Sequence, residues 1–161
     1  MLVHTAFPRD LIAPIPAPVS PTSERSLREL RTLVAFFTGH ASTIAPMIRP
    51  NPRERQYERL LLDGTVEVWL IAWATGQWTR RHDHGGALGA LGVLQGAVVE
   101  EQSATVRTLH HGDTAVFRRG TIHRVGNDRP EAAVTVHAYS PPLIPLQYHE
   151  TAAASAVPAF A

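Results

Sequence analysis

The chain contains no cysteine, which excludes disulfide bonds and thiolate metal ligands. It also lacks an apolar run long enough to span a membrane, and its first residues carry no basic leader region and are broken by prolines. We therefore expect no signal peptide, no membrane association and a cytoplasmic location. Neither sign of charge dominates, because 15 basic residues balance 14 acidic ones without forming a stripe. This balance argues against a nucleic-acid partner.

The composition is that of an ordinary globular protein. Of 161 residues, 44% are hydrophobic and 18% are charged, which predicts one compact domain over residues 1–161 and favours a small-molecule partner. The nine histidines are the obvious candidates for binding a transition metal, because cysteine is absent. Any metal site should therefore be rich in nitrogen ligands.

The first third of the chain predicts an irregular segment followed by helix. Residues 1–21 are rich in proline and show no periodicity. Residues 23–50 read as helical, with Ser23 as a candidate N-cap and Gly39 as the end of the first helix. The apolar residues that recur at helical spacing are Leu27, Leu30, Leu33, Val34 and Phe37. A second helix within 41–48 can be only a turn or two long, because prolines follow closely.

From residue 55 to residue 148 the pattern is that of a β-barrel. The runs RQYERLLL and TVEVWLIAWA flank Asp63-Gly64, a dipeptide that favours a two-residue hairpin turn. Further short runs follow, separated by turns that contain glycine or charged residues. We expect eight or more strands in a barrel or sandwich.

Two blocks of this barrel region carry a spaced set of histidines. The first places His82 and His84 between Gly76 and Gly96, and the second places His123 between Gly112 and Asn127. Together they resemble the two sequence motifs of the cupin superfamily, whose fold is a double-stranded β-helix, or jelly-roll barrel, with a metal in its mouth. The resemblance implies a mainly β fold with one or two N-terminal helices.

The chain departs from the cupin pattern at two positions. Many cupins have glutamate where this chain has Gly89 and proline where it has Arg118. The missing glutamate leaves three neutral imidazoles, on His82, His84 and His123, as the protein ligands. Such a site leaves Fe(II) with its full charge and about three open positions, which suit a substrate thiolate and O2. Ordinary turn histidines, a three-histidine zinc hydrolase and a non-catalytic metal-binding cupin are the alternatives.

A third stretch, AVTVHAYSPP, places three polar side chains on one face of a strand. Thr135, His137 and Tyr139 alternate with Val136 and Ala138, and alternate residues of a strand share a face. The pattern suits a hydroxyl, imidazole and phenol relay. A strand with one polar face turned to water is the alternative interpretation.

These segments together are similar to the thiol dioxygenases, and specifically to cysteine dioxygenase. HDH, GTIHRVGN and TVHAYSPP carry the resemblance over roughly residues 55–145. It implies that His82, His84 and His123 hold Fe(II), which binds the thiolate and amine of cysteine while O2 converts the sulfur to a sulfinic acid. Tyr139 would point its hydroxyl at the bound substrate. His137 would hold that phenol, and Thr135, where many relatives have serine, would fix the imidazole tautomer.

The resemblance also implies a substrate anchor. Arg59, in QYERLLL, aligns with the family's arginine that pairs with the substrate carboxylate, and a guanidinium offers a carboxylate two parallel hydrogen bonds. Relatives that prefer mercaptopropionate have glutamine there, so Arg59 favours cysteine. Tyr57 shares its face and is a candidate for lining the pocket. A solvated surface arginine is the plainer interpretation of Arg59, and mercaptopropionate or another small thiol carboxylate is the alternative substrate.

Three further expectations complete this interpretation. Animal cysteine dioxygenases have a cysteine at the position of Gly89 and cross-link it to the tyrosine, so Tyr139 should be unmodified here, as in bacterial relatives with glycine. The resemblance implies a cis Ser140-Pro141 bond. His110 and His111 are adjacent, which makes a poor chelate because neighbouring strand residues face opposite ways. The partners expected are a small thiol and O2, with the protein a monomer.

Overall fold

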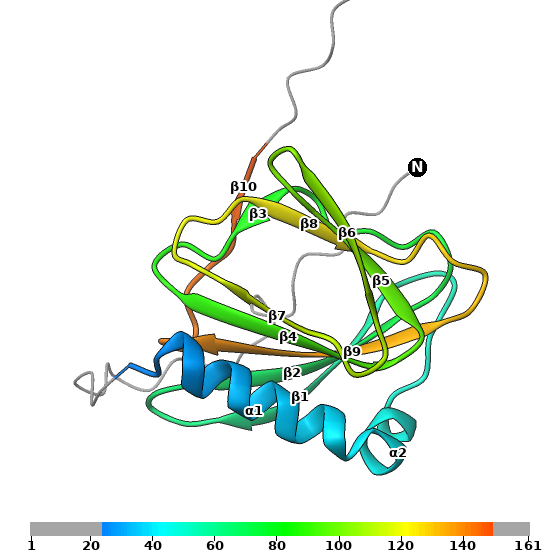
Figure 1. Ribbon diagram of the computed structural model, residues 1–161, viewed down its shortest axis with the longest axis horizontal. Coiled ribbons are helices and arrows are strands. Elements are labelled where there is room, and N and C mark those ends of the chain that lie inside the picture. The colour runs from blue at the N-terminus through cyan, green and yellow to red at the C-terminus, as the bar shows by residue number, and fades with distance from the viewer. Residues whose placement is uncertain (1–23, 150–161) are drawn as a thin grey trace, which may run out of the picture.

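The computed structural model describes residues 24–149, which fold into a mainly β structure of two facing sheets with helices on one side (Figure 1). All the strand pairs within this range are antiparallel. The first sheet has the order β1 (Gln56–Leu62), β2 (Glu67–Trp73), β9 (Ala133–Ser140), β4 (Leu88–Gln95) and β7 (Thr114–Phe117). The second has the order β10 (Gln147–Tyr148), β3 (His82–Asp83), β8 (His123–Gly126), β5 (Ala97–Gln102) and β6 (Thr105–His110).

Helix α1 (Leu27–Gly39) lies across the outer side of the first sheet (Figure 1). It begins after Ser26, whose hydroxyl accepts from the backbone N–H of Glu29 while the Glu29 carboxylate accepts from the backbone N–H of Ser26. This reciprocal capping box favours Ser26 as the N-cap over Ser23, which lies outside the described residues, as does the proline-rich segment. The second short helix is confirmed as α2 (Ala41–Ile44) and the 3-10 turn η2 (Ala45–Met47).

The hairpin between β1 and β2 is confirmed, but the expected two-residue turn is wrong. Residues 63–66 form the connection, closed by a hydrogen bond from the Asp63 N–H to the Val66 carbonyl. The Asp63 carboxylate accepts from the backbone N–H groups of Thr65 at 2.7 Å and Val66 at 2.9 Å. Because this side chain satisfies the backbone of the turn, a longer loop replaces the glycine-based turn.

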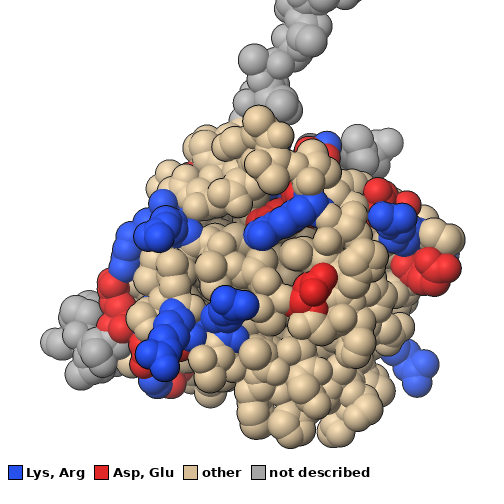
Figure 2. Space-filling model, in the orientation of Figure 1, with Lys and Arg blue, Asp and Glu red and all other residues tan. Residues whose placement is uncertain are grey.

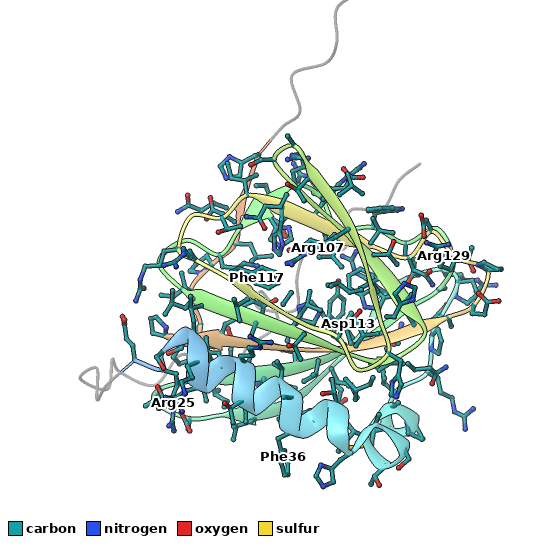
Figure 3. All side chains as sticks on the ribbon, in the orientation of Figure 1. Arg25, Phe36, Arg107, Asp113, Phe117 and Arg129 are labelled. Atoms are coloured by element: carbon teal, nitrogen blue, oxygen red, sulfur yellow. The ribbon has the colours of Figure 1, made fainter. Side chains whose placement is uncertain are left out.

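Strand β9 separates two cores, because its side chains alternate between the two faces of the first sheet. On the outer face Val134, Val136 and Ala138 pack with Leu30 and Val34 of α1. Burying a side chain such as Leu30 or Val34 contributes roughly 1.5–3 kcal/mol, so this layer holds the helix on the sheet. The inner face holds an aromatic core between the sheets, of which the labelled Phe117 is part (Figure 3).

The charged side chains on the visible face lie singly or in small groups and form no continuous patch of one sign (Figure 2). No helix within residues 24–149 is long and apolar enough to cross a bilayer.

Candidate metal centre

Three buried histidines meet at the inner face of the second sheet. His82 lies on β3, His84 directly follows that strand, and His123 begins β8, where it pairs with His82. One ring nitrogen from each histidine can be chosen so that all three lie within 4.8 Å of one another. The Nε2 atoms of His84 and His123 are 3.0 Å apart, a spacing suited to two ligands of one metal ion at about 2.1 Å. The structure therefore brings together the three histidines that the sequence predicts as ligands, in an arrangement that could hold a metal ion.

The far ring nitrogens of two of these histidines are held by the protein. Nδ1 of His82 is 2.8 Å from the Arg80 carbonyl, and Nδ1 of His123 is 2.8 Å from the Glu100 carboxylate. Hydrogen bonding at Nδ1 leaves Nε2 of each ring for a metal. Burial lowers the pKa of His82 to about 3, with the charges of His123 and Arg55 adding to the shift. The His82 ring is therefore neutral near pH 7, as a metal ligand must be.

Glu100 is a fully buried carboxylate behind His123. Its second oxygen accepts from Nε of Arg107 at 2.6 Å. Burial alone would raise the pKa of Glu100, but the hydrogen bonds from His123 and Arg107 bring it below its ordinary value. Glu100 is therefore ionised, and it fixes the orientation of the His123 ring.

The residue between the first two histidines anchors their strand on its other side. The Asp83 carboxylate accepts from the Gly85 N–H and lies 2.6 Å from Nε2 of His149, just beyond β10. Gly85 has φ +57, a conformation that glycine adopts without steric cost, and a Cβ there would lie 2.9 Å from Ile144. The sharp turn at Gly85 thus directs His84 inward before the chain enters β4.

The opposite wall of the barrel carries a continuous hydrogen-bonded chain along β9. Oγ1 of Thr135 lies 2.8 Å from Nε2 of His137, and Nδ1 of His137 lies 3.1 Å from the Tyr139 hydroxyl. Trp73 on β2 donates its indole N–H to Oγ1 of Thr135 at 2.8 Å. These residues are buried, so the alternative of a polar face turned to water is wrong. Burial lowers the pKa of His137 to about 3, with charges on His123, His82 and Arg55 contributing.

Tyr139, on β9 of the first sheet, contacts His84, which follows β3 of the second sheet. Its ring stacks on His84 with centroids 4.4 Å apart and planes inclined by 28°. Gly89 on β4 pairs with Tyr139, and a Cβ at Gly89 would lie 3.2 Å from the tyrosine ring and 2.8 Å from Phe117. Glycine at this position therefore leaves room for the phenol beside the histidines. The cis Ser140-Pro141 bond expected after the tyrosine is confirmed.

The two residues expected to line the pocket face the barrel interior from β1. Tyr57 packs against the inner core, and Arg59 pairs with Trp69 with its guanidinium carbon 5.4 Å from the centre of the Trp69 ring. Nη1 of Arg59 is buried and has no hydrogen-bond partner in the described structure.

His110 and His111 are exposed and lie outside the histidine cluster, as expected.

Three residues of the site were not anticipated from the sequence. Glu100 and Trp73 each hold one of the polar groups described above, and Arg55 lines a cavity beside His82 and His123. In the sequence, the signal for Glu100 is that a carboxylate lies within the predicted strand AVVEEQ, where every second side chain faces the same way. For Arg55 there was only its two-residue spacing from Tyr57, which puts both on the same side of an extended chain.

A barrel of two facing antiparallel sheets with a buried cluster of three histidines defines a cupin with a candidate metal site. Solved structures share this fold. A protein with a double-stranded β-helix domain from Klebsiella pneumoniae gives a TM-score of 0.61 at 23% identity, over 68% of this chain and 96% of that chain. A cupin superfamily protein from Desulfitobacterium hafniense gives a TM-score of 0.55 at 16% identity, over 60% of this chain and 86% of that chain.

A family model describes the chain more specifically than these folds do. The model of cysteine dioxygenase type I matches residues 27–151, which include the three histidines and the polar chain on β9. The protein belongs to the cysteine dioxygenase type I family, and it is a thiol dioxygenase.

Proposed function

We propose that the protein is an Fe(II)-dependent cysteine dioxygenase that converts L-cysteine to cysteine sulfinic acid. The observation that carries the proposal is the stacking of Tyr139 on His84 at 4.4 Å, because it sets a phenol beside the candidate metal ligands. In the overall reaction both atoms of O2 form bonds to the sulfur. The sulfur loses four electrons and O2 gains four, so no other reductant is needed.

His82, His84 and His123 would hold the iron. Three neutral imidazoles fit Fe(II), because they leave its charge uncompensated and several positions open for anionic ligands. When bound, the iron supplies a site at which a thiolate and O2 can meet. The protein's own contribution is to keep the three rings neutral and oriented, through burial, Glu100 and the Arg80 carbonyl.

The polar chain on β9 would direct the phenol of Tyr139. Trp73 can only donate, so Thr135 accepts from it and turns its own hydrogen toward Nε2 of His137. A neutral His137 then carries its proton on Nδ1 and donates to the Tyr139 oxygen. This direction leaves the Tyr139 O–H as a donor toward the bound substrate or oxygen, where it would stabilise developing negative charge.

Arg59 would bind the carboxylate of cysteine. A guanidinium stays charged, so its buried Nη1 calls for an acceptor that the described residues do not supply. A substrate carboxylate would complete this bond while the thiolate and amine reach the metal. Tyr57, two residues earlier on the same strand, would line the pocket beside it.

Oxygen uptake by protein loaded anaerobically with Fe(II) tests the proposal. We expect one O2 consumed per sulfinate formed, with L-cysteine preferred to 3-mercaptopropionate, and sulfinic acid identified by mass. A preference for 3-mercaptopropionate would retain a thiol dioxygenase but overturn the substrate assignment. No uptake with either thiol, despite bound iron, would overturn the proposed function and favour a non-catalytic cupin, while zinc in the purified protein would favour a hydrolase.

Substitution of Arg59 by glutamine tests the substrate anchor separately. We expect kcat/KM for L-cysteine to fall roughly 10- to 100-fold, the worth of a charge-assisted hydrogen bond, and the preference to shift toward 3-mercaptopropionate. An unchanged preference would contradict the assignment of Arg59.

The cytoplasmic location, the monomeric state and the single domain over residues 1–161 stay predictions, and gel filtration would test the monomer.

A further inference from the structure

One buried carboxylate of the barrel interior has no part in the mechanism proposed above. Glu67 begins β2, is fully buried and is paired with Tyr139 of β9 in the first sheet. Its Oε2 accepts from the indole N–H of Trp69 at 2.9 Å, and its Oε1 accepts from the backbone N–H of Leu143 at 3.1 Å. Because a carboxylate is costly to remove from water, an apolar side chain would serve packing better at this position.

The indole that Glu67 binds also contacts Arg59. Trp69 is paired with Arg59 on β1 and with His137 on β9, so it lies between these two residues in the first sheet. The guanidinium carbon of Arg59 is 5.4 Å from the centre of the Trp69 ring. Cation–π attraction acts over the face of a ring, so the orientation of the indole decides where the guanidinium is held. Glu67 fixes that orientation by accepting from the indole N–H.

Trp73, on the same strand, provides a comparison within the molecule. Its ring also carries a guanidinium, that of Arg55 at 5.0 Å, but its indole N–H donates to the neutral hydroxyl of Thr135. A hydrogen bond to a carboxylate is stronger than one to a neutral acceptor, and it polarises the donor. The indole ring then becomes more negative and attracts a cation more strongly. Of the two rings, Trp69 is therefore the one better suited to hold a guanidinium in place.

The second hydrogen bond of Glu67 connects this group to the segment that follows the tyrosine strand. Leu143 lies three residues beyond the end of β9 and has a φ of 61°, a left-handed conformation that is uncommon for leucine. In this conformation its N–H donates to the Glu67 carboxylate. One donor thus lies on the strand of Trp69 and the other on a separate segment, so the carboxylate is fixed from two directions.

We infer that Glu67 is a positioning residue for Arg59, acting through the indole of Trp69. The inference rests on the proposed function, in which Arg59 binds the carboxylate of the substrate. A guanidinium that is already held on the ring loses less conformational freedom when the substrate binds. In this role Glu67 contributes to substrate affinity and leaves the oxidation step unchanged.

Anaerobic calorimetry with L-cysteine and Fe(II)-loaded protein tests the inference. We expect Glu67→Gln to weaken the binding of L-cysteine roughly 2- to 10-fold, the range for ordering one side chain on binding, with kcat unchanged. Trp69→Phe, which keeps an aromatic ring but has no N–H, should give a similar loss. Glu58→Gln is the matched control, because it removes a carboxylate from an exposed position next to Arg59 and should leave the affinity unaffected.

The Arg59→Gln background separates positioning from general support of the barrel. If Glu67 acts through Arg59, Glu67→Gln will change the affinity for L-cysteine by less than about twofold when Arg59 is already replaced. An equal loss in both backgrounds would show that Glu67 acts independently of Arg59 and would overturn the inference. A fall in kcat with unchanged affinity would overturn it as well.

Nuclear magnetic resonance of the full chain loaded with diamagnetic Zn(II) gives a readout that needs no turnover. The side-chain protons of a guanidinium over an indole ring are shifted upfield, and those of Arg59 are assigned as the signals missing in Arg59→Gln. We expect Glu67→Gln to reduce this shift and Glu58→Gln to leave it unchanged. Oxidation of L-cysteine by a protein in which Glu67→Gln leaves the shift unchanged would overturn the inference and leave the proposed function standing. A reduced shift in a protein that oxidises no thiol would support the positioning of Arg59 while the proposed function fails.

Discussion

The two faces of strand β9 differ in composition although they alternate along the same eight residues. The outer face carries Val134, Val136 and Ala138 against helix α1, and at its end the hydroxyl of Ser140 accepts from the backbone N–H of Arg25, just before the helix. The inner face carries polar side chains that bond one another and Trp73. Because successive residues of a strand face opposite ways, one strand holds the helix with half of its side chains and builds the site with the other half.

We expect the polar inner face of β9 to stabilise the fold less than its aliphatic outer face. A buried polar group gains little from a hydrogen bond that replaces one to water, and leaving it unpaired costs about 1–3 kcal/mol. The chain from Trp73 through Thr135 and His137 to Tyr139 avoids that cost by satisfying each member in turn. The aliphatic outer face, by contrast, gains free energy with each buried methylene. We therefore expect substitutions on the two faces to separate activity from stability.

The largest effect should come from the site itself. His82→Ala removes one of three candidate ligands, so we expect loss of stoichiometric iron and a fall in thiol oxidation of about a thousandfold or more, equivalent to at least ~4 kcal/mol. Metal analysis and oxygen uptake measure the two effects. His110→Ala is the matched control, because His110 is exposed and lies outside the cluster. Retained iron and activity in His82→Ala would contradict the assignment of the metal centre.

The outer face should show the opposite behaviour. Leu30→Ala deletes a fully buried side chain between α1 and the sheet, and we expect the free energy of unfolding to fall by about 2–5 kcal/mol. Urea denaturation measures this loss, and the protein that remains folded should keep its kcat. Phe36→Ala is the control on the same helix, since Phe36 is 59% exposed and points away from the sheet (Figure 3). Equal losses in the two variants would contradict the packing described here.

Glu100→Gln tests whether the negative charge of Glu100 helps His123 to bind a metal. Glutamine keeps an acceptor near Nδ1 of His123 but loses the negative charge, so we expect iron affinity to fall roughly 10- to 100-fold. A competition titration with a metal chelator measures the change. Glu101→Gln is the matched control, because the neighbouring Glu101 faces the other way and pairs with Arg124 at the surface. Equal affinity in Glu100→Gln and the wild type would show that the charge is dispensable.

The sequence predicts those parts of the site that depend on local spacing. The His-x-His pair and the alternation at Thr135, His137 and Tyr139 follow from strand periodicity and motif spacing. Glu100 could not be chosen over Glu101, because the register of β5 against β8 decides which carboxylate turns inward. Arg55 was equally hidden, since only packing on Trp73 distinguishes it from other nearby arginines. These residues depend on pairing between distant segments, which no local pattern encodes.

The error at the first hairpin has a different cause, because two local interactions compete there. Asp63-Gly64 is a strong local signal for a tight turn. In the structure the Asp63 carboxylate bonds two backbone N–H groups of the loop, which stabilises the longer connection. Helix α1 was predictable at its end, Gly39, and less so at its start, where the reciprocal bonds between Ser26 and Glu29 decide the cap.

The last expected effect is a pH dependence of stability, to which His137 on the inner face of β9 contributes. His137 has an ordinary pKa of 6.5, and burial lowers its pKa to about 3 in the folded protein. Between these values the unfolded chain binds a proton at His137 that the native state does not, so the free energy of unfolding rises with pH. The stabilisation is complete above pH 6.5 and is lost as the pH falls toward 3. Each such histidine contributes a slope of up to ~1.4 kcal/mol per pH unit.

The variant His137→Phe isolates this slope, because phenylalanine fills similar space and does not titrate. Urea denaturation of metal-free protein from pH 7 to pH 4 should give a shallower pH dependence for His137→Phe than for the wild type. His111→Phe, at an exposed position, is the matched control for the introduction of a phenylalanine. His82, whose pKa is also lowered by burial, and carboxyl groups such as Glu100, whose pKa is lowered by its hydrogen bonds, contribute to the dependence that remains in His137→Phe. An identical slope in wild type and His137→Phe would mean that His137 takes up its proton in the folded state, and both of its ring nitrogens would then donate, which reverses only the bond to Thr135.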